Sequence, residues 1–392
     1  MPEDAAGKKE RKISKAFQPY VDAEWALKNY WYPALFSSEL AEGELKGVKI
    51  CGVPIALRRA KGKVYALKDE CIHRGVELSA RPMCLTDETV TCWYHGFTYD
   101  LASGELVSIV AAPDDKMIGN ARLRTFPVEE KSGMIFVFVG DEDYKTPPLS
   151  RDMPHRLPED YEHRVAHPLD DNAVLLGIHR TGNSNWRLAV ENGADTGHLF
   201  IHLDNPLVMA LDRQLPLGAI AESEDAISWY VDDDAPKGIV NEYTKYTPVL
   251  ENKVVGLKVK GKNPWKGGRT SMFLPGVLLV ENWPDYRLAQ YEWYVPIDNE
   301  HHEYWEIIAA VCNTEEEKKE FEIQYENLWK NLALGQGFND NDLFAREQMQ
   351  KFYGHHSGWT DEVLCSLDAY VIAWRKLVAQ HNRGLAEVPE RG

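Results

Sequence analysis

The 392-residue sequence contains no apolar run close to the length of about 18 residues that a transmembrane helix needs. Positive charge is also scarce, because 44 Lys and Arg residues stand against 61 Asp and Glu residues, for a formal net charge of -17. This excess of acid argues against nucleic acid or an anionic membrane as the main partner. The charged stretch 1–15 leads into no hydrophobic segment, so we expect no secretory signal and a cytoplasmic protein.

Cysteine is sparse as well. The six cysteines are Cys51, Cys71, Cys84, Cys92, Cys312 and Cys365. Without an export signal, reduced thiols are the default state, and clustered cysteines then indicate a metal site rather than a disulfide.

The chain divides into two parts with different patterns. From about residue 45 to 140, short strand-like runs are separated by turn signals, which predicts a small all-β domain. A proline-bearing stretch at 144–160 reads as a linker. Beyond it, strand-like runs alternate with helical patterns. The predicted helices are 184–203, 314–333, 341–353 and 360–382.

These patterns predict an α+β protein whose second domain has a broad antiparallel sheet covered by helices. We place an N-terminal tail and helix at 1–35, the all-β domain at 36–155 and the larger domain at 156–392.

The first chemical constellation lies in the β domain. Cys71-x-His73 is followed after eighteen residues by Cys92-x-x-His95. Two thiolates and two imidazoles on two loops can hold a tetrahedral zinc ion or a mixed-ligand iron–sulfur cluster. Structural zinc sites usually space paired ligands by two to four residues. The one-residue step from Cys71 to His73 therefore favours the cluster.

The stretches "CIHRG" and "CWYHGF" resemble the Rieske signature of the ring-hydroxylating oxygenases. The resemblance implies a [2Fe–2S] cluster held by Cys71, His73, Cys92 and His95. The family usually has tryptophan where this chain has Phe97.

A second constellation lies in "NSNWRLAVENGADTGHLFIH" at 183–202. On a continuous helix, Asp195, His198 and His202 would fall on one face, and two histidines four apart can bind one metal. With a carboxylate from elsewhere they would form the facial triad of non-haem Fe(II) oxygenases. Taken alone, such a histidine pair is more often a solvated or core pair.

"NWRLAVENGADTGH" resembles the iron-binding segment of Rieske non-haem iron oxygenases. The resemblance implies Fe2+ bound by His198, His202 and Asp342. Asp342 is preferred because a hydrophobic residue and a glutamate five positions on follow it, as in the family; Asp340 is the alternative. Many members place four residues between the histidines, and the three found here are similar to the carbazole-degrading branch.

Asp195 by itself could be an exposed helix acid. In the family, the corresponding aspartate orients the neighbouring histidine and bridges to a Rieske histidine of the next subunit. The resemblance therefore gives Asp195 a catalytic role next to His198, with a contact to His95 of the partner subunit, and implies a homotrimer.

The resemblance covers nearly the whole chain, and stretches such as "LPGVL", "EWYVPID" and "AWRKL" are similar to the terminal oxygenases of carbazole 1,9a-dioxygenases. It implies a helix-grip, START-like catalytic domain. The implied reaction adds both atoms of O2 to adjacent carbons of carbazole or a related polycyclic aromatic, giving an aminobiphenyl diol. Electrons would come from NAD(P)H through a ferredoxin reductase and a ferredoxin.

The same resemblance gives the substrate-binding residues. They are Gly193, Leu278, Trp283, Gln290 and Phe338. Gly193 would offer its carbonyl to the substrate N–H, although a helix break for packing explains a glycine equally well. Trp283 stands where the carbazole enzymes have phenylalanine, so substrate preference or regiochemistry is expected to differ.

Three other readings of the chain remain. A Rieske monooxygenase or O-demethylase would share both metal sites. An electron carrier would use only the cluster, and a zinc-stabilised binding module would be colourless.

Overall fold

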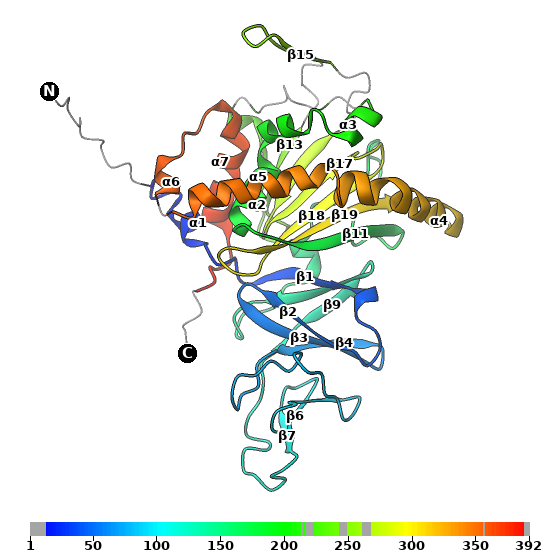
Figure 1. Cartoon of the computed structure of the whole chain (residues 1–392), viewed down its shortest axis with the longest axis vertical. Helices are drawn as coiled ribbons and strands as arrows, with labels where there is room; N and C mark the ends of the chain where they lie inside the picture. The colour runs from blue at the N-terminus through cyan, green and yellow to red at the C-terminus, as the bar shows by residue number, and fades with distance from the viewer. Residues whose placement is uncertain are drawn as a thin grey trace, which may run out of the picture.

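The protein is described from a computed structural model over residues 13–212, 215, 221, 223–242, 249–260, 268–355 and 357–387. Most of the predicted tail lies outside these residues. In Figure 1 an N-terminal β part lies below a larger part in which helices surround a broad sheet. The arrangement confirms the predicted α+β class. No helix formed by the described residues is long and apolar enough to cross a membrane.

The larger part is built on a seven-stranded sheet with the order β11-β19-β18-β17-β16-β13-β12, in which all neighbours are antiparallel. The strands are β11 (Ala173–Gly182), β12 (Ser228–Tyr230), β13 (Gly238–Glu242), β16 (Arg269–Phe273), β17 (Val277–Glu281), β18 (Ala289–Pro296) and β19 (His302–Val311). A separate hairpin pairs β14 (Val249–Asn252) with β15 (Leu257–Lys260).

The register of β17 and β18 creates one mixed face. Leu278 pairs with Glu292, and Val280 pairs with Gln290. Because side chains alternate along a strand and directly opposed residues share a face, these four side chains point the same way. A one-residue slip would turn all of them to the other face, so the register decides what the site contains.

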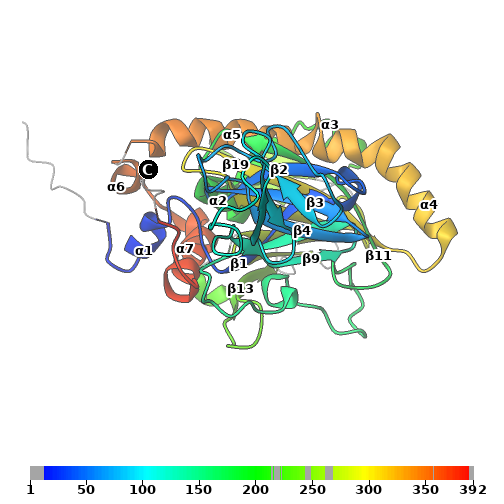
Figure 2. The ribbon, with the colours of Figure 1, turned by 90° about the horizontal axis from the view of Figure 1, so that it is seen from below.

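Helices flank this sheet. They are α1 (Gln18–Asp22), α2 (Trp186–Ala194), α3 (Pro206–Ala210), α4 (Glu315–Gln324), α5 (Phe338–Tyr353), α6 (Gly358–Asp361) and α7 (Ala369–His381), with short turns η1 (Ser37–Glu39), η2 (Leu149–Asp152), η3 (Thr196–His202), η4 (Glu224–Ala226) and η7 (Ser366–Asp368), and a π-helix η6 (Tyr325–Leu334). α5 crosses one face of the sheet, and Figure 2 shows it in one ridge with α4. α7 is tied to the sheet because the Tyr370 hydroxyl donates to the carbonyls of Ile239 and Thr270 at 2.9 and 3.0 Å.

Two predicted helices are interrupted, and the prediction of each as one helix is wrong. Helix 184–203 breaks at Asp195, whose backbone is extended (φ -75°, ψ 109°) and whose side chain accepts from the Gly197 N–H at 2.7 Å. Helix 360–382 breaks at Glu362, also extended (ψ 149°), where Arg375 and Tyr353 bind the carboxylate. In both places a side-chain hydrogen bond replaces helix continuation.

The N-terminal part is all-β, as predicted. Its strands are β1 (Tyr30–Phe36), β2 (Leu45–Ile50), β3 (Val53–Ala60), β4 (Lys63–Lys68), β5 (Thr89–Thr91), β6 (Phe97–Asp100), β7 (Leu106–Ile109), β8 (Thr125–Phe126), β9 (Val128–Lys131) and β10 (Met134–Val139). They form the sheets β1-β10-β9, β2-β3-β4-β8 and β5-β6-β7. The small sheet β5-β6-β7 lies at the end farthest from the helices in Figure 1.

A histidine between two carboxylates joins the two parts. His179 on β11 lies 2.6 Å from Glu303 on β19 through Nδ1 and 3.0 Å from Glu39 of η1 through Nε2. Its ring stacks on Trp305 with a centroid distance of 4.4 Å. Burial alone would lower the pKa of His179, but hydrogen bonds to Glu303 and Glu39 outweigh it and raise that pKa above its usual value.

His179→Gln tests this junction. A raised folded-state pKa gives stability that is complete below the unfolded pKa of about 6.5 and is lost as pH rises through the folded-state pKa. We therefore expect the variant to lose about 1–2 kcal/mol of unfolding free energy at about pH 6 and clearly less at about pH 9. Urea unfolding at the two pH values measures the difference. An equal loss at both, or the same loss in a His301→Gln control, would contradict the interpretation.

Candidate metal centres and substrate cavity

Two similar loops carry the first set of predicted ligands. In each loop a glycine N–H four residues on donates to the cysteine carbonyl, from Gly75 to Cys71 at 2.8 Å and from Gly96 to Cys92 at 2.9 Å. Both glycines have positive φ, 68° and 71°, a conformation that costs glycine little. The repeated turn explains why each half of the motif ends in glycine.

The loops bring histidines from both halves together. Nδ1 of His73 and Nδ1 of His95 lie 3.1 Å apart. The thiols of Cys71 and Cys92 are buried, 2 and 1 % exposed, whereas His73 is exposed and His95 is partly exposed. Buried thiols behind two surface imidazoles suit a mixed-ligand [2Fe–2S] cluster whose histidine side faces a partner.

The contacts around these loops are specific. Phe97, at the position where tryptophan was expected, stacks on His73 with a centroid distance of 4.8 Å and an interplanar angle of 10°. The Tyr99 hydroxyl lies 3.2 Å from the Cys71 sulfur. A hydroxyl next to a ligating thiolate is one of the features that tune the reduction potential of such clusters.

The second set of predicted ligands converges between η3 and α5. His198 and His202 both belong to η3, and Nε2 of each lies 3.4 Å from Oδ1 of Asp342 on α5. Among the described residues this is the only group of at least three histidine, cysteine or acidic side chains gathered closely enough to hold a metal ion. The break at Asp195 therefore does not separate the histidines, because both lie beyond it.

The donor atoms fit a cation. Within the described part of the chain, both ring nitrogens of His202 and Oδ1 of Asp342 are buried without a hydrogen-bond partner. Burial alone would raise the pKa of Asp342, but His202, His198 and Arg346 lower it to about 2. A buried, ionised carboxylate beside unpaired imidazoles is costly unless a metal completes it.

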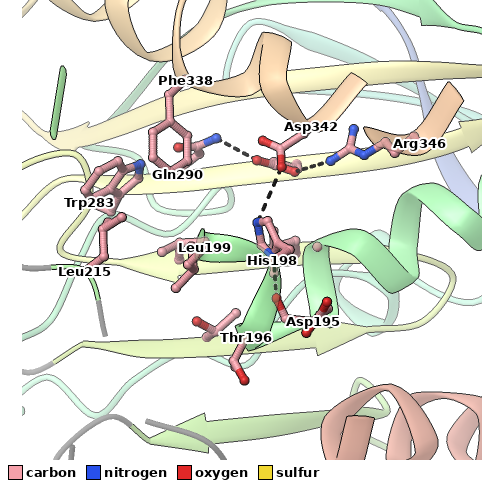
Figure 3. Close-up of a pocket in the computed structure, with 15 residues that line it drawn as sticks. Asp195, Thr196, His198, Leu199, Leu215, Trp283, Gln290, Phe338, Asp342 and Arg346 are labelled. Carbon is pink, nitrogen blue, oxygen red and sulfur yellow. Dashed lines mark hydrogen bonds and ion pairs between the residues drawn. The ribbon is translucent and has the colours of Figure 1, made fainter. Parts of the chain in front are cut away.

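The orientation of His198 is set by Asp195, but through its backbone. The Nδ1–H of His198 donates to the Asp195 carbonyl, which leaves Nε2 facing Asp342; Figure 3 shows both interactions. The Asp195 carboxylate instead binds the Gly197 N–H. Burial raises the pKa of Asp195, and nearby Asp368 adds to the effect.

Asp340 occupies a different environment from Asp342. Its carboxylate lies 2.5 Å from Arg180 Nη1, and its side chain is 41 % exposed. Arg180 also donates to the carbonyls of Leu334 and Gly335 and pairs with buried Glu306. This geometry makes Asp340 part of a clamp on the start of α5, while Asp342 faces the histidines.

A cavity of about 550 Å³, its open mouth included, adjoins the triad. All five predicted substrate residues line it, and so does Asp195. The ring of Trp283 packs on that of Phe338 with a centroid distance of 4.9 Å. The Phe338 ring in turn stacks on the His202 ring, with a centroid distance of 3.6 Å and an interplanar angle of 13°. This aromatic wall leads from the cavity to the triad.

Gly193 is required by packing. A Cβ at this position would lie 2.1 Å from the Tyr294 hydroxyl oxygen and 3.2 Å from Leu278. The residue lines the cavity as well, so close packing and a place next to the substrate apply together.

Two charged residues that line the cavity were not predicted. Glu292 and Arg346 line it, and Arg346 donates to Asn192 at 2.7 Å while its guanidinium lies over the Tyr304 ring at 4.2 Å. Sequence signals existed for both: Glu292 is two residues from Gln290 on a strand, and Arg346 is one helical turn beyond Asp342.

Comparisons with known proteins agree with two iron sites in one chain. The family of homotrimeric ring hydroxylases matches residues 138–386, and the Rieske [2Fe–2S] domain matches 30–127. The chain belongs to the Rieske ring-hydroxylating oxygenases. It is 42 % identical to the terminal oxygenase component of carbazole 1,9a-dioxygenase from Metapseudomonas resinovorans, over 95 % of both chains.

Two solved structures are also similar. A 2-oxoquinoline 8-monooxygenase component is 50 % identical with a TM-score of 0.91, covering 97 % of this chain and 92 % of that one. A fluorene-bound variant oxygenase in complex with the ferredoxin of carbazole 1,9a-dioxygenase is 41 % identical with a TM-score of 0.86, covering 95 % and 96 %.

These matches confirm the predicted enzyme class, an aromatic ring-hydroxylating oxygenase with a Rieske [2Fe–2S] cluster and non-haem iron. The carrier-only reading leaves the ring-hydroxylase match over 138–386 unexplained, and the zinc-module reading leaves the Rieske match unexplained.

The triad is tested by Asp342→Ala, with Asp340→Ala as the matched control two residues away. Loss of the buried carboxylate should lower iron from about three to about two atoms per chain and leave the visible spectrum of the cluster unchanged. Asp340→Ala should retain the third iron. Iron analysis combined with absorption spectra measures both effects. Loss of the third iron in Asp340→Ala but not in Asp342→Ala would make Asp340 the ligand.

Proposed function

We propose that Cys71, His73, Cys92 and His95 hold the Rieske cluster, and that His198, His202 and Asp342 hold the mononuclear Fe2+. The convergence of the three donors, of which His202 and Asp342 are buried, supports the second assignment most strongly. The bound iron would supply dioxygen activation, with electrons arriving from the cluster. We assign the cluster to a domain at 36–155 and the iron to a domain at 156–392, after an N-terminal tail and helix.

We further propose that the chain is the terminal oxygenase of a multicomponent dioxygenase acting on carbazole or a related polycyclic aromatic in the cytoplasm. The reaction would be angular dioxygenation, with both oxygen atoms added to adjacent carbons. The identity to the carbazole enzyme and the aromatic wall formed by Trp283 and Phe338 support this assignment.

The residues of the cavity have distinct tasks in this scheme. Leu278, Trp283 and Phe338 exclude water and fix the plane of the substrate, while Gln290 and the Gly193 carbonyl give it direction. The backbone of Asp195 holds the His198 ring so that Nε2 faces Asp342.

Assembly and electron supply belong to the same proposal. The ring-hydroxylase family is described as homotrimeric, and carbazole dioxygenase oxygenases occur in complexes with ferredoxin. We propose a homotrimer in which the carboxylate of Asp195 meets His95 of the partner subunit. A ferredoxin, reduced by its reductase with NAD(P)H, would supply the cluster.

A second candidate reaction is monooxygenation of a 2-oxoquinoline-type substrate. The observation favouring it is the 50 % identity and TM-score of 0.91 to the 2-oxoquinoline 8-monooxygenase component. Trp283 supports it too, because this larger side chain stands in the cavity wall where the carbazole enzymes are expected to have phenylalanine.

Labelled dioxygen separates the two candidates. The purified oxygenase, supplied with a ferredoxin, its reductase and NADH, is given carbazole or 2-oxoquinoline under 18O2, and products are analysed by mass spectrometry. Carbazole dioxygenation predicts two labelled oxygens in a ring-opened aminobiphenyl diol. One labelled oxygen in a hydroxylated 2-oxoquinoline, with carbazole unchanged, would replace the first proposal with the second.

A further inference from the structure

Gln290 presents an unpaired acceptor beside the substrate cavity. The side chain lines the cavity and is 2 % exposed. Among the described residues, its Oε1 is buried without a hydrogen-bond partner. A buried carbonyl oxygen without a partner is unusual, because the lost hydration is not repaid. The missing donor must come from something that enters the cavity.

The nitrogen of the same amide is fully engaged. Gln290 Nε2 donates to Glu292 Oε1 at 2.6 Å and to Asn339 Oδ1 at 3.4 Å. Glu292 Oε1 also accepts from Asn339 Nδ2 at 3.3 Å, so this oxygen is an acceptor and the Gln290 atom that faces it is the nitrogen. Both N–H groups are thereby used, and the oxygen is left on the cavity side. Figure 3 shows the nitrogen end of Gln290 joined by a dashed line to this network.

Further hydrogen bonds fix Glu292 and Asn339, the two partners of the Gln290 amide nitrogen. The hydroxyl of Tyr294 donates to Glu292 Oε2 at 2.5 Å, and Arg346 lies 3.8 Å from the same oxygen. Asn339 donates to Glu292 at 3.3 Å and to the Tyr304 hydroxyl at 2.9 Å, which fixes its own amide. Turning the Gln290 amide over would point its oxygen at a carboxylate. The orientation is therefore a built feature of the buried core.

Around this acceptor the cavity is apolar. Val280 is the direct cross-strand neighbour of Gln290, and Leu278, Trp283 and Phe338 line the same cavity. A ligand that brings no donor would leave Oε1 unpaired in an apolar environment, whereas a ligand with a ring N–H or a hydroxyl would satisfy it. Sites of this kind discriminate strongly against analogues that lack the donor.

We propose that Gln290, oriented by Glu292 and Asn339, is a specificity determinant that selects fused-ring aromatics carrying a ring N–H donor. The inference rests on the proposed function, and it deepens that function by naming the chemical group that is recognised. Carbazole and 2-oxoquinoline, the substrates named in the two related enzymes, both carry such a group. Fluorene has the carbazole shape with CH2 in place of N–H.

Binding to the wild-type holoenzyme is the first test. Isothermal titration calorimetry compares carbazole with fluorene, and 2-oxoquinoline with its N-methyl derivative. We expect the N–H member of at least one pair to bind about tenfold or more tightly. Equal affinity within both pairs, or no binding of any of the four compounds, overturns the proposal.

Two substitutions then assign the selectivity to Gln290. Gln290→Leu removes the acceptor oxygen and keeps a side chain of similar size. Gln290→Asn keeps the amide but shortens the side chain by one methylene, which moves the oxygen away from the cavity. If one variant does not fold, the other still provides the test. Either should reduce the N–H preference to about twofold or less, mainly by weakening the N–H ligand. Val280→Ala is the control, because it should weaken both members of a pair and keep their ratio. If the N–H preference persists in both Gln290 variants, the acceptor lies elsewhere, for example at the Gly193 carbonyl, and the proposal is overturned.

The test is independent of turnover. Selective binding without any oxygenated product would support the role of Gln290 and refute the proposed reaction. If carbazole and fluorene bind equally well and give product at equal rates, the proposed reaction would be supported and the role of Gln290 refuted.

Discussion

The site depends on an electrostatic constraint: Asp342 and His202 are buried together, with donor atoms that no described residue satisfies. An ionised carboxylate in such a place is strongly unfavourable by itself. We propose that a divalent cation bound by Asp342, His202 and His198 removes this cost. The clamp of Arg180 on the start of α5 and the carbonyl of Asp195 hold the three donors where that cation can be shared.

The substrate side is built on the same elements. Phe338 begins α5, four residues before Asp342, and stacks directly on His202. Arg346, four residues after Asp342, lies between that carboxylate and Glu292, which in turn holds the Gln290 amide. One helix thus positions a proposed iron ligand, an aromatic wall and the support for a polar group of the cavity. In the proposed function, the packed core rather than mobile loops would place the substrate relative to the iron.

Much of this could be predicted from the sequence because short motifs fix local geometry. The two Cys/His loops, the histidine pair and Asp342 were predicted from spacing and family resemblance, and the all-β domain and the broad antiparallel sheet were predicted from hydrophobic patterns. The order of the strands in that sheet was not predicted. The break at Asp195 was missed, because a side-chain cap competes with a helical pattern on nearly equal terms. The roles of Glu292, Arg346 and Asn339 could not be predicted, since they arise from strand register and the packing of α5, which are long-range contacts.

The central claim, two different iron sites in one chain, is tested most directly by metal and acid-labile sulfide content of the purified protein, with visible spectra before and after dithionite. The account predicts about three irons and about two sulfides per chain, with a brown colour that bleaches on reduction. Two irons would require reconstitution with Fe2+ before the triad is judged. Zinc with no visible absorption, or a third iron that cannot be restored, would contradict the account.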